Sequence, residues 1–266
     1  MSDRVKIDFK DGVADVRMTR ADKMNAIDSE MFEGLVQAGR ALRDDKSVRA
    51  VVLSGEGRGF CAGLDMGSFA AMGSGNRQAG DPKLFERSES GANRAQLAAW
   101  IWQELPVPVI AAVHGVAYGG GLQIALGADI RIVAPDAKLS VMEVKWGLIP
   151  DMSGTQTLRR LVRQDVAKEL TFTGRVFSGK EAVELGIATR ASENPLDEAL
   201  DLARQIALKS PDAVRAAKRL LNESWQGTVA EGLKLEETLQ RSLIGQPNQI
   251  ESVRANFEKR PPHFKD

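Results

Sequence analysis

Residues 109–129 constrain the fold of this chain more than any other stretch. Residues 109–113, VIAAV, form a continuous apolar run of the kind found in strands buried on both faces of a parallel sheet. Glycines at 115 and 119–121 interrupt the run, and residues 122–126 then have the composition of a short buried helix that ends at Gly127. This succession of strand, glycine turn and helix predicts an α/β fold built around the strand.

The glycines at 119–121 leave backbone N–H groups bare at the start of the predicted helix. Such a corner favours negative charge, and it suits a phosphate or a carbonyl oxygen that becomes an oxyanion during a reaction. A tight packing turn is the alternative interpretation of the glycines alone. A second glycine-rich segment, residues 54–66 (SGEGRGFCAGLDM), favours the binding interpretation, because its glycines also allow close approach of backbone to a ligand.

The rest of the chain begins as alternating strands and helices and ends as helices only. Residues 5–18 predict a hairpin around Asp11-Gly12, and Asp28 is a suitable N-cap for a helix that ends near residue 44. A strand at 48–53 follows. Further elements are predicted as a mobile loop at 67–82, helices at 84–105, 153–163 and 165–172, a short helix opened by a capping box at 178–181, and C-terminal helices at 196–209, 211–224, 229–243 and 249–258.

Composition narrows the class of protein. The 266 residues include 36 basic and 36 acidic side chains, so the zero net charge gives no electrostatic basis for binding nucleic acid or an anionic membrane. Cys61 is the one cysteine, which excludes an intrachain disulfide and favours a reducing compartment. His114 and His263 are far apart, so no metal site is expected. We therefore expect a cytoplasmic protein without a membrane-spanning segment.

Candidates for a catalytic nucleophile are poor, whereas two loop acids are better placed. Cys61 has no histidine near it in sequence, and His114 follows an apolar strand, where a structural role is expected. Glu143 and Asp151 are flanked by apolar residues, which would raise a carboxyl pKa and suit it to proton transfer. The alternative for each acid is an ordinary solvated side chain.

Three motifs in order carry a resemblance to a known family. They are FCAGLD at 60–65, glycines at 115 and 119–121, and Glu143 followed by GLIPD at 147–151. This arrangement resembles the crotonase superfamily, also called the enoyl-CoA hydratase/isomerase family, over essentially the whole chain. The resemblance implies an acyl-CoA-binding core at residues 1–195, built as a spiral of ββα units. It also implies a helical oligomerisation region at 196–266, in a homotrimer or a dimer of trimers.

The resemblance also implies a substrate site. It places the N–H groups of Ala62 and Gly120 in an oxyanion hole for an acyl-CoA thioester, with CoA as part of the substrate and no separate cofactor. Lys259 matches a C-terminal lysine near CoA phosphates, in the same or a neighbouring subunit. The other implied substrate-binding residues are Lys23, Met24, Ala26, Gly63, Leu64, Asp65 and Met66.

The acid/base residues depart from the best-known members. Hydratases of this family use two glutamates, and Gln123 stands at the first position while Glu143 matches the second. Gln123 can orient substrate or water but cannot take a proton. Asp151 matches a catalytic aspartate of dienoyl-CoA isomerases. We therefore favour an isomerase that shifts a double bond, with Glu143 as proton shuttle and Asp151 assisting; enoyl-CoA hydration and a non-catalytic RNA-binding or scaffold role are the alternatives.

The acyl tail is expected against residues 67–95. Ordinary core packing is the alternative for each wall residue. The candidate wall residues are Met66, Phe69, Met72, Phe85 and Trp100.

Overall fold

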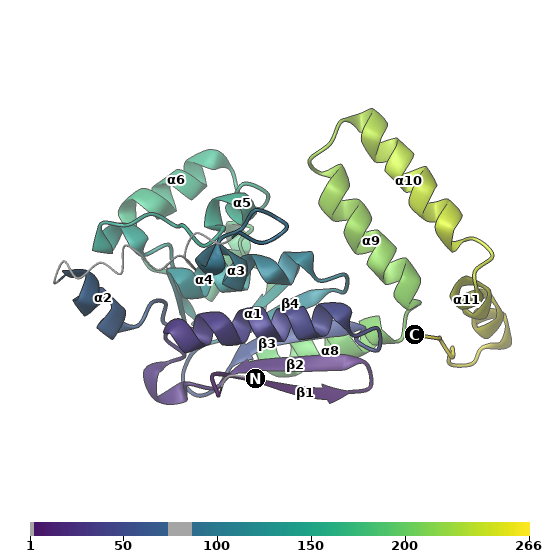
Figure 1. Ribbon diagram of the computed structural model, residues 1–266, viewed down its shortest axis with the longest axis horizontal. Coiled ribbons are helices and arrows are strands. Elements are labelled where there is room, and N and C mark those ends of the chain that lie inside the picture. The colour runs from purple at the N-terminus through teal and green to yellow at the C-terminus, as the bar shows by residue number, and fades with distance from the viewer. Residues whose placement is uncertain (1–2, 74–86) are drawn as a thin grey trace.

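The computed structural model describes residues 3–73 and 87–266 (Figure 1). Its main sheet has one antiparallel edge pair, and the later neighbours are parallel. A smaller sheet lies beside it. In order, the main sheet holds β1 (Val5–Lys10), β2 (Val13–Met18), β3 (Ala50–Gly55), β4 (Val109–Val113), β6 (Ile130–Val133) and β9 (Arg190–Ala191), and the smaller one β5 (Val116–Tyr118), β7 (Lys138–Ser140) and β8 (Phe177–Ser178).

Different helices cover the two faces of the main sheet, as Figure 1 shows, with α1 (Ser29–Asp44) and α3 (Arg94–Glu104) on one side and α8 (Pro195–Ala207) on the other. Side chains of β4 alternate between two apolar cores: Val109, Ala111 and Val113 lie on the α1 side, and Ile110 and Ala112 on the α8 side. The prediction of a strand buried on both faces is therefore confirmed. Helix α8 packs on this sheet, although the sequence grouped it with the C-terminal helices.

Short elements follow β4 along the chain and form the region around the glycines at residues 119–121. They place the predicted loop acids beside these glycines. These elements are α4 (Gly120–Leu126), the 3-10 helix η3 (Glu143–Trp146), α5 (Gly154–Leu158), α6 (Gln164–Thr173) and α7 (Gly179–Glu184).

The C-terminal helices leave the core. Helices α9 (Pro211–Ser224) and α10 (Val229–Leu243) pack on each other as a projecting hairpin, and α11 (Pro247–Glu258) lies beyond it (Figure 1). No helix in the described part of the chain is both long and apolar enough to cross a membrane.

Three local predictions were wrong. Residues 66–73 form helix α2 (Met66–Gly73) where a loop was expected, and the helix expected at 84–105 begins at Arg94, after a capping box made by Asn93. Ser153 precedes α5 but makes no side-chain cap bond. The remaining residues of the expected loop and helix start, 74–86, lie outside the described residues.

A buried ion pair fixes α9 to the core. The ammonium group of Lys218 lies 2.7 Å from the Asp129 carboxylate and donates to the carbonyl oxygens of Trp102 and Val107 at 3.2 and 2.9 Å. The Asp129 carboxylate also accepts a bond from the Val109 N–H at 2.7 Å. One lysine thus joins α9 to the start of β4, the end of α3 and the start of β6.

Lys218→Met is expected to lower the free energy of unfolding by about 3–5 kcal/mol, because the substitution leaves the partly buried Asp129 carboxylate without its cation. Urea unfolding followed by circular dichroism measures the loss. Lys209→Met, which removes an exposed lysine just before α9, serves as the control and is expected to change stability by about 0.5 kcal/mol or less. Equal losses in the two variants would contradict the anchoring role.

Candidate active site

The two glycine-rich segments predicted from the sequence are hydrogen-bonded to each other; in chain order, residues 54–66 form the first corner and residues 115–121 the second. The Cys61 N–H donates to the Val116 carbonyl at 3.0 Å, and the Tyr118 N–H donates to the Cys61 carbonyl at 3.1 Å. A Cβ atom on Gly121 would lie 2.3 Å from the Cys61 carbonyl oxygen, so glycine is required for this approach. The Cys61 thiol is buried between the corners, where it donates to the Asn25 carbonyl oxygen at 3.1 Å.

Gly63 brings the first corner to the start of α4. Its φ of +85° lies in the left-handed region, and a Cβ atom there would lie 2.6 Å from the Tyr118 carbonyl oxygen. The same position is 3.8 Å from the Gly120 nitrogen. Backbone around residues 63–64 and the first N–H of α4 are therefore close together.

The oxyanion donor predicted at Ala62 needs correction. The Ala62 N–H donates to the Met24 carbonyl at 2.9 Å, so it is already occupied. Leu64 pairs with Ile27 in an isolated β-bridge that does not use the Leu64 N–H. The Ile27 N–H donates to the Gly63 carbonyl, and the Asp65 N–H donates to the Ile27 carbonyl. No described residue accepts a bond from the N–H of Leu64.

The second predicted donor is free. Gly119 donates its N–H to the Ser140 carbonyl at 2.9 Å, whereas no described residue accepts from the N–H of Gly120. Gly120 is the first residue of α4, where helix N–H groups have no partner within the helix. The available pair of donors is therefore Leu64 and Gly120.

Glu143 lies buried beside this corner and is held by Gln123. The Gln123 side-chain amide donates to Glu143 Oε1 at 2.6 Å, while Glu143 Oε2 is buried without a partner among the described residues. A Cβ atom on Gly119 would lie 3.3 Å from Glu143 Oε1, which places the carboxylate next to the residue before Gly120. Gln123 Oε1 in turn accepts from the N–H groups of Met152 and Gly154 at 2.8 and 2.9 Å.

The surroundings raise the pKa of both predicted acids. Burial raises the pKa of Glu143, and the negative charge of Asp151 raises it further, against hydrogen bonds that lower it, including the one from Gln123. Desolvation of its carboxyl also raises the pKa of Asp151, although that residue keeps an exposed side. A buried carboxylate with one free oxygen and a raised pKa is suited to accept and return a proton.

Part of the predicted CoA site comes together around the first corner. Lys23 is exposed at the end of the 3-10 helix η1 (Ala21–Lys23), and Met24 has a φ of +47°. Ala26 is buried, and its N–H donates to the Lys23 carbonyl at 3.0 Å. Met66, in contrast, is exposed at the start of α2.

Sequence reasoning missed Arg20, which joins the two segments of this region. Its guanidinium donates to the Asp65 carboxylate at 2.7 Å and to the Ala26 carbonyl at 3.1 Å. The Gly67 N–H and Arg20 hold the pKa of Asp65 below its usual range. The only indication in the sequence was the position of Arg20, a basic residue three positions before Lys23 in a predicted binding segment.

Lys259 is not brought to this region within one chain. It is exposed and follows α11, which lies at the end of the molecule opposite α2 (Figure 1).

The residues predicted to line the acyl tail lie in different surroundings. Phe69 of α2 stacks on Trp146 of η3, with ring centroids 4.3 Å apart, a partner that the sequence analysis did not predict. Met72 is exposed on α2. Trp100 lies under the Arg160 guanidinium, 5.7 Å away, and Phe85 lies outside the described residues.

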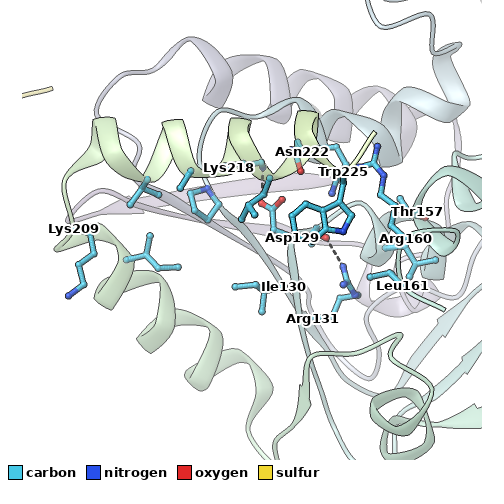
Figure 2. Close-up of a pocket in the computed structure, with 18 residues that line it drawn as sticks. Asp129, Ile130, Arg131, Thr157, Arg160, Leu161, Lys209, Lys218, Asn222 and Trp225 are labelled. Carbon is cyan, nitrogen blue, oxygen red and sulfur yellow. Dashed lines mark hydrogen bonds and ion pairs between the residues drawn. The ribbon is translucent and has the colours of Figure 1, made fainter. Parts of the chain in front are cut away.

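A large cavity lies elsewhere in the molecule. This space of about 520 Å³ is lined by residues of α9 and by residues at the starts of β4 and β6. Figure 2 shows Asp129, Lys218 and Trp225 among the side chains that line it. None of the predicted site residues lines it. The glycine corners follow the opposite, C-terminal end of β4, where ligands bind in α/β sheets.

Nearly the whole chain is similar to proteins of one known family. Residues 8–266 match the family described as "Enoyl-CoA hydratase/isomerase". The human "Methylglutaconyl-CoA hydratase, mitochondrial" is 36% identical over 263 residues, which cover 96% of this chain and 74% of that protein. A "Probable enoyl-CoA hydratase" of Bacillus subtilis is 36% identical over 244 residues, which cover 91% of each chain. The crystal structure of an enoyl-CoA hydratase from Bacillus anthracis superposes with a TM-score of 0.89 at 30% identity, covering 98% of this chain and 99% of that one.

Proposed function

The chain belongs to the enoyl-CoA hydratase/isomerase family of enzymes, and we propose that it moves protons on an enoyl-CoA thioester held at the glycine corners. The N–H groups of Leu64 and Gly120 bind the thioester oxygen and stabilise the enolate that forms on it. Glu143 takes and returns the proton, with Asp151 assisting through its charge. The proposed chemistry requires no group beyond the CoA of the substrate.

The free Oε2 atom of Glu143 carries this proposal. In a 3-enoyl-CoA it would remove a proton from C2, so that the electrons move onto the thioester oxygen. The proton then returns at C4, and the double bond lies between C2 and C3. One carboxylate suffices for both transfers. Gln123 cannot act as a second base, and its amide already binds Glu143, which favours isomerisation over two-glutamate hydration.

Hydration is the second candidate, and the names of the relatives favour it. The human and Bacillus subtilis relatives are both described as hydratases. Here Glu143 would act as a single base: it takes a proton from water while the water oxygen joins C3 of a 2-enoyl-CoA, and it then gives that proton to C2 of the enolate.

A substrate panel separates the two reactions. Short, medium and long 2-enoyl-, 3-enoyl- and 3,5-dienoyl-CoA thioesters are incubated with the enzyme in ¹⁸O-labelled water, and the products are followed by mass spectrometry. Isomerisation gives an unchanged mass with a shifted absorbance spectrum. A product heavier by one labelled water would establish hydration instead.

A non-catalytic RNA-binding role makes a different prediction. It requires a gel shift with RNA at physiological salt and no turnover of any thioester. The zero net charge of the chain argues against it.

We propose the homotrimer or dimer of trimers that the family resemblance implies, and the apolar surface of the C-terminal helices supports association of this kind. Trp225, Val229 and Phe257 are 70%, 80% and 84% exposed. Apolar surface of this extent marks protein–protein contact. In such an assembly Lys259 would reach a neighbouring subunit. Sedimentation velocity tests the proposal, and a monomer at micromolar concentration would exclude it.

A further inference from the structure

We propose that Gln123 is a positioning residue that binds the Glu143 carboxylate and the turn at residues 152–154 into one hydrogen-bonded unit. The unit anchors Glu143 Oε1 and leaves Oε2 as the atom that exchanges the proton. This inference rests on the function proposed above for Glu143.

The turn at 152–154 forms a concave pair of donors around Gln123. Ser153 has a φ of +66°, which is uncommon for a residue other than glycine, and this conformation turns the N–H groups of Met152 and Gly154 toward one acceptor. The Ser153 hydroxyl is itself buried without a partner among the described residues. Backbone bonds therefore hold this conformation: the N–H groups on either side of Ser153 bind Gln123, and the Ser153 carbonyl accepts from the Gln156 N–H at 2.9 Å.

The turn at 152–154 packs tightly against the Gln123 side chain. A Cβ atom on Gly154 would lie 2.6 Å from Gln123 Oε1, so the contact requires glycine. Gln123 is itself buried within α4, so its side-chain amide depends on protein partners for its hydrogen bonds.

Only one orientation of the Gln123 amide satisfies its neighbours. The oxygen faces two N–H donors, and the nitrogen faces a carboxylate. A flipped amide would place two acceptors together at Glu143 and two pairs of donors together at the turn. A glutamine supplies the donor to Glu143 at every pH, whereas a glutamic acid supplies one only while it is protonated.

Few charges act on Glu143, so the Gln123 bond should be visible in its titration. Helices α2, α4 and α5 and strand β5 contain no charged residue, and Lys145 of η3 is exposed. The charge that raises the pKa of Glu143 is that of Asp151. The charged residues of α6, which packs against η3, are Asp165, Lys168 and Glu169, all exposed.

Gln123→Met tests the role, because it keeps the length of the side chain and removes its donor. The donor favours the ionised carboxylate, so its loss raises the pKa of Glu143. A general base must be ionised, so the acid limb of the kcat/KM–pH profile is expected to move to higher pH by about one unit. We expect kcat to fall at least about tenfold while KM changes about twofold or less.

Two further variants separate positioning from packing. Thr157→Val removes a buried hydroxyl that donates to the Gly154 carbonyl at 3.1 Å and leaves Gln123 in place, so the acid limb is expected to stay where it is. Gln123→Glu is expected to restore stability relative to Gln123→Met, because the N–H groups of the turn regain an acceptor. Its acid limb is expected above that of the wild type, since the second carboxyl repels ionised Glu143.

A titration without substrate makes the test independent of the reaction. The Glu143 carboxyl is observed by ¹³C NMR in ligand-free protein and assigned with Glu143→Gln. A higher Glu143 pKa in Gln123→Met supports the inference, and an unchanged pKa overturns it, whichever thioester is turned over. Should Gln123→Met fail to fold, the same comparison with Gln123→Ala decides, because that variant also lacks the donor and adds no charge beside Glu143. Full activity of Glu143→Gln would overturn the proposed function and leave the titration result standing.

Discussion

Glu143→Gln is expected to lower kcat/KM by about 10²–10⁴-fold, the usual contribution of a general acid or base. The substitution keeps the shape of the side chain, and its amide oxygen can still accept the bond from Gln123. It removes the group that can carry a proton. The loss is therefore expected in kcat, with KM for the thioester little changed.

Steady-state kinetics on the preferred thioester measure this effect, and Asp151→Asn is the matched comparison. Asp151 acts on Glu143 through its negative charge, so neutralising it lowers the pKa of Glu143. The acid limb of the pH profile should then move to lower pH, with a smaller fall in kcat. A Glu143→Gln enzyme as active as the wild type would exclude Glu143 as the proton carrier.

Gly120→Pro is expected to reduce kcat by about 10²–10³-fold, because proline removes one of the two oxyanion donors. Residue 120 is the first of α4, a position where proline is accommodated without loss of a helix bond. The added Cβ atom would meet Met152 Sδ at 2.7 Å and Ile27 Cδ1 at 3.0 Å, both ends of flexible side chains.

Gly120→Ala controls for that crowding. It adds the same Cβ atom and keeps the N–H, so the ratio of the two rates isolates the donor. Circular dichroism checks that both variants fold. Equal rates for the alanine and proline variants would show that the Gly120 N–H does not stabilise the transition state.

The frame of the fold follows from local patterns in the sequence. Residues 109–113 are apolar at every position, and the structure buries them on both faces. Asp11-Gly12 makes the predicted hairpin turn with positive φ at both residues, and the Asp28 side chain caps α1 by accepting from the Met31 N–H at 2.8 Å. Each of these features depends on neighbouring residues, which is why a sequence can predict it.

The donors of the site depend on contacts between distant segments. Nothing near Ala62 in sequence indicates that its N–H is bound to Met24, 38 positions earlier. The same holds for Gln123, whose partners are Glu143 and the turn beginning at Met152. The resemblance predicted which segments meet, but the choice of donor at the first corner required the hydrogen bonds.

Cys61 makes the meeting of the two corners observable. Desolvation raises the pKa of its buried thiol to about 12, and only the thiolate form attacks an alkylating reagent. Alkylation therefore requires the corners to separate, and the chain has no other cysteine to react. The rate of Cys61 alkylation therefore measures how often the oxyanion site opens locally. A thioester that binds only the closed form lowers this rate in proportion to its occupancy of the site.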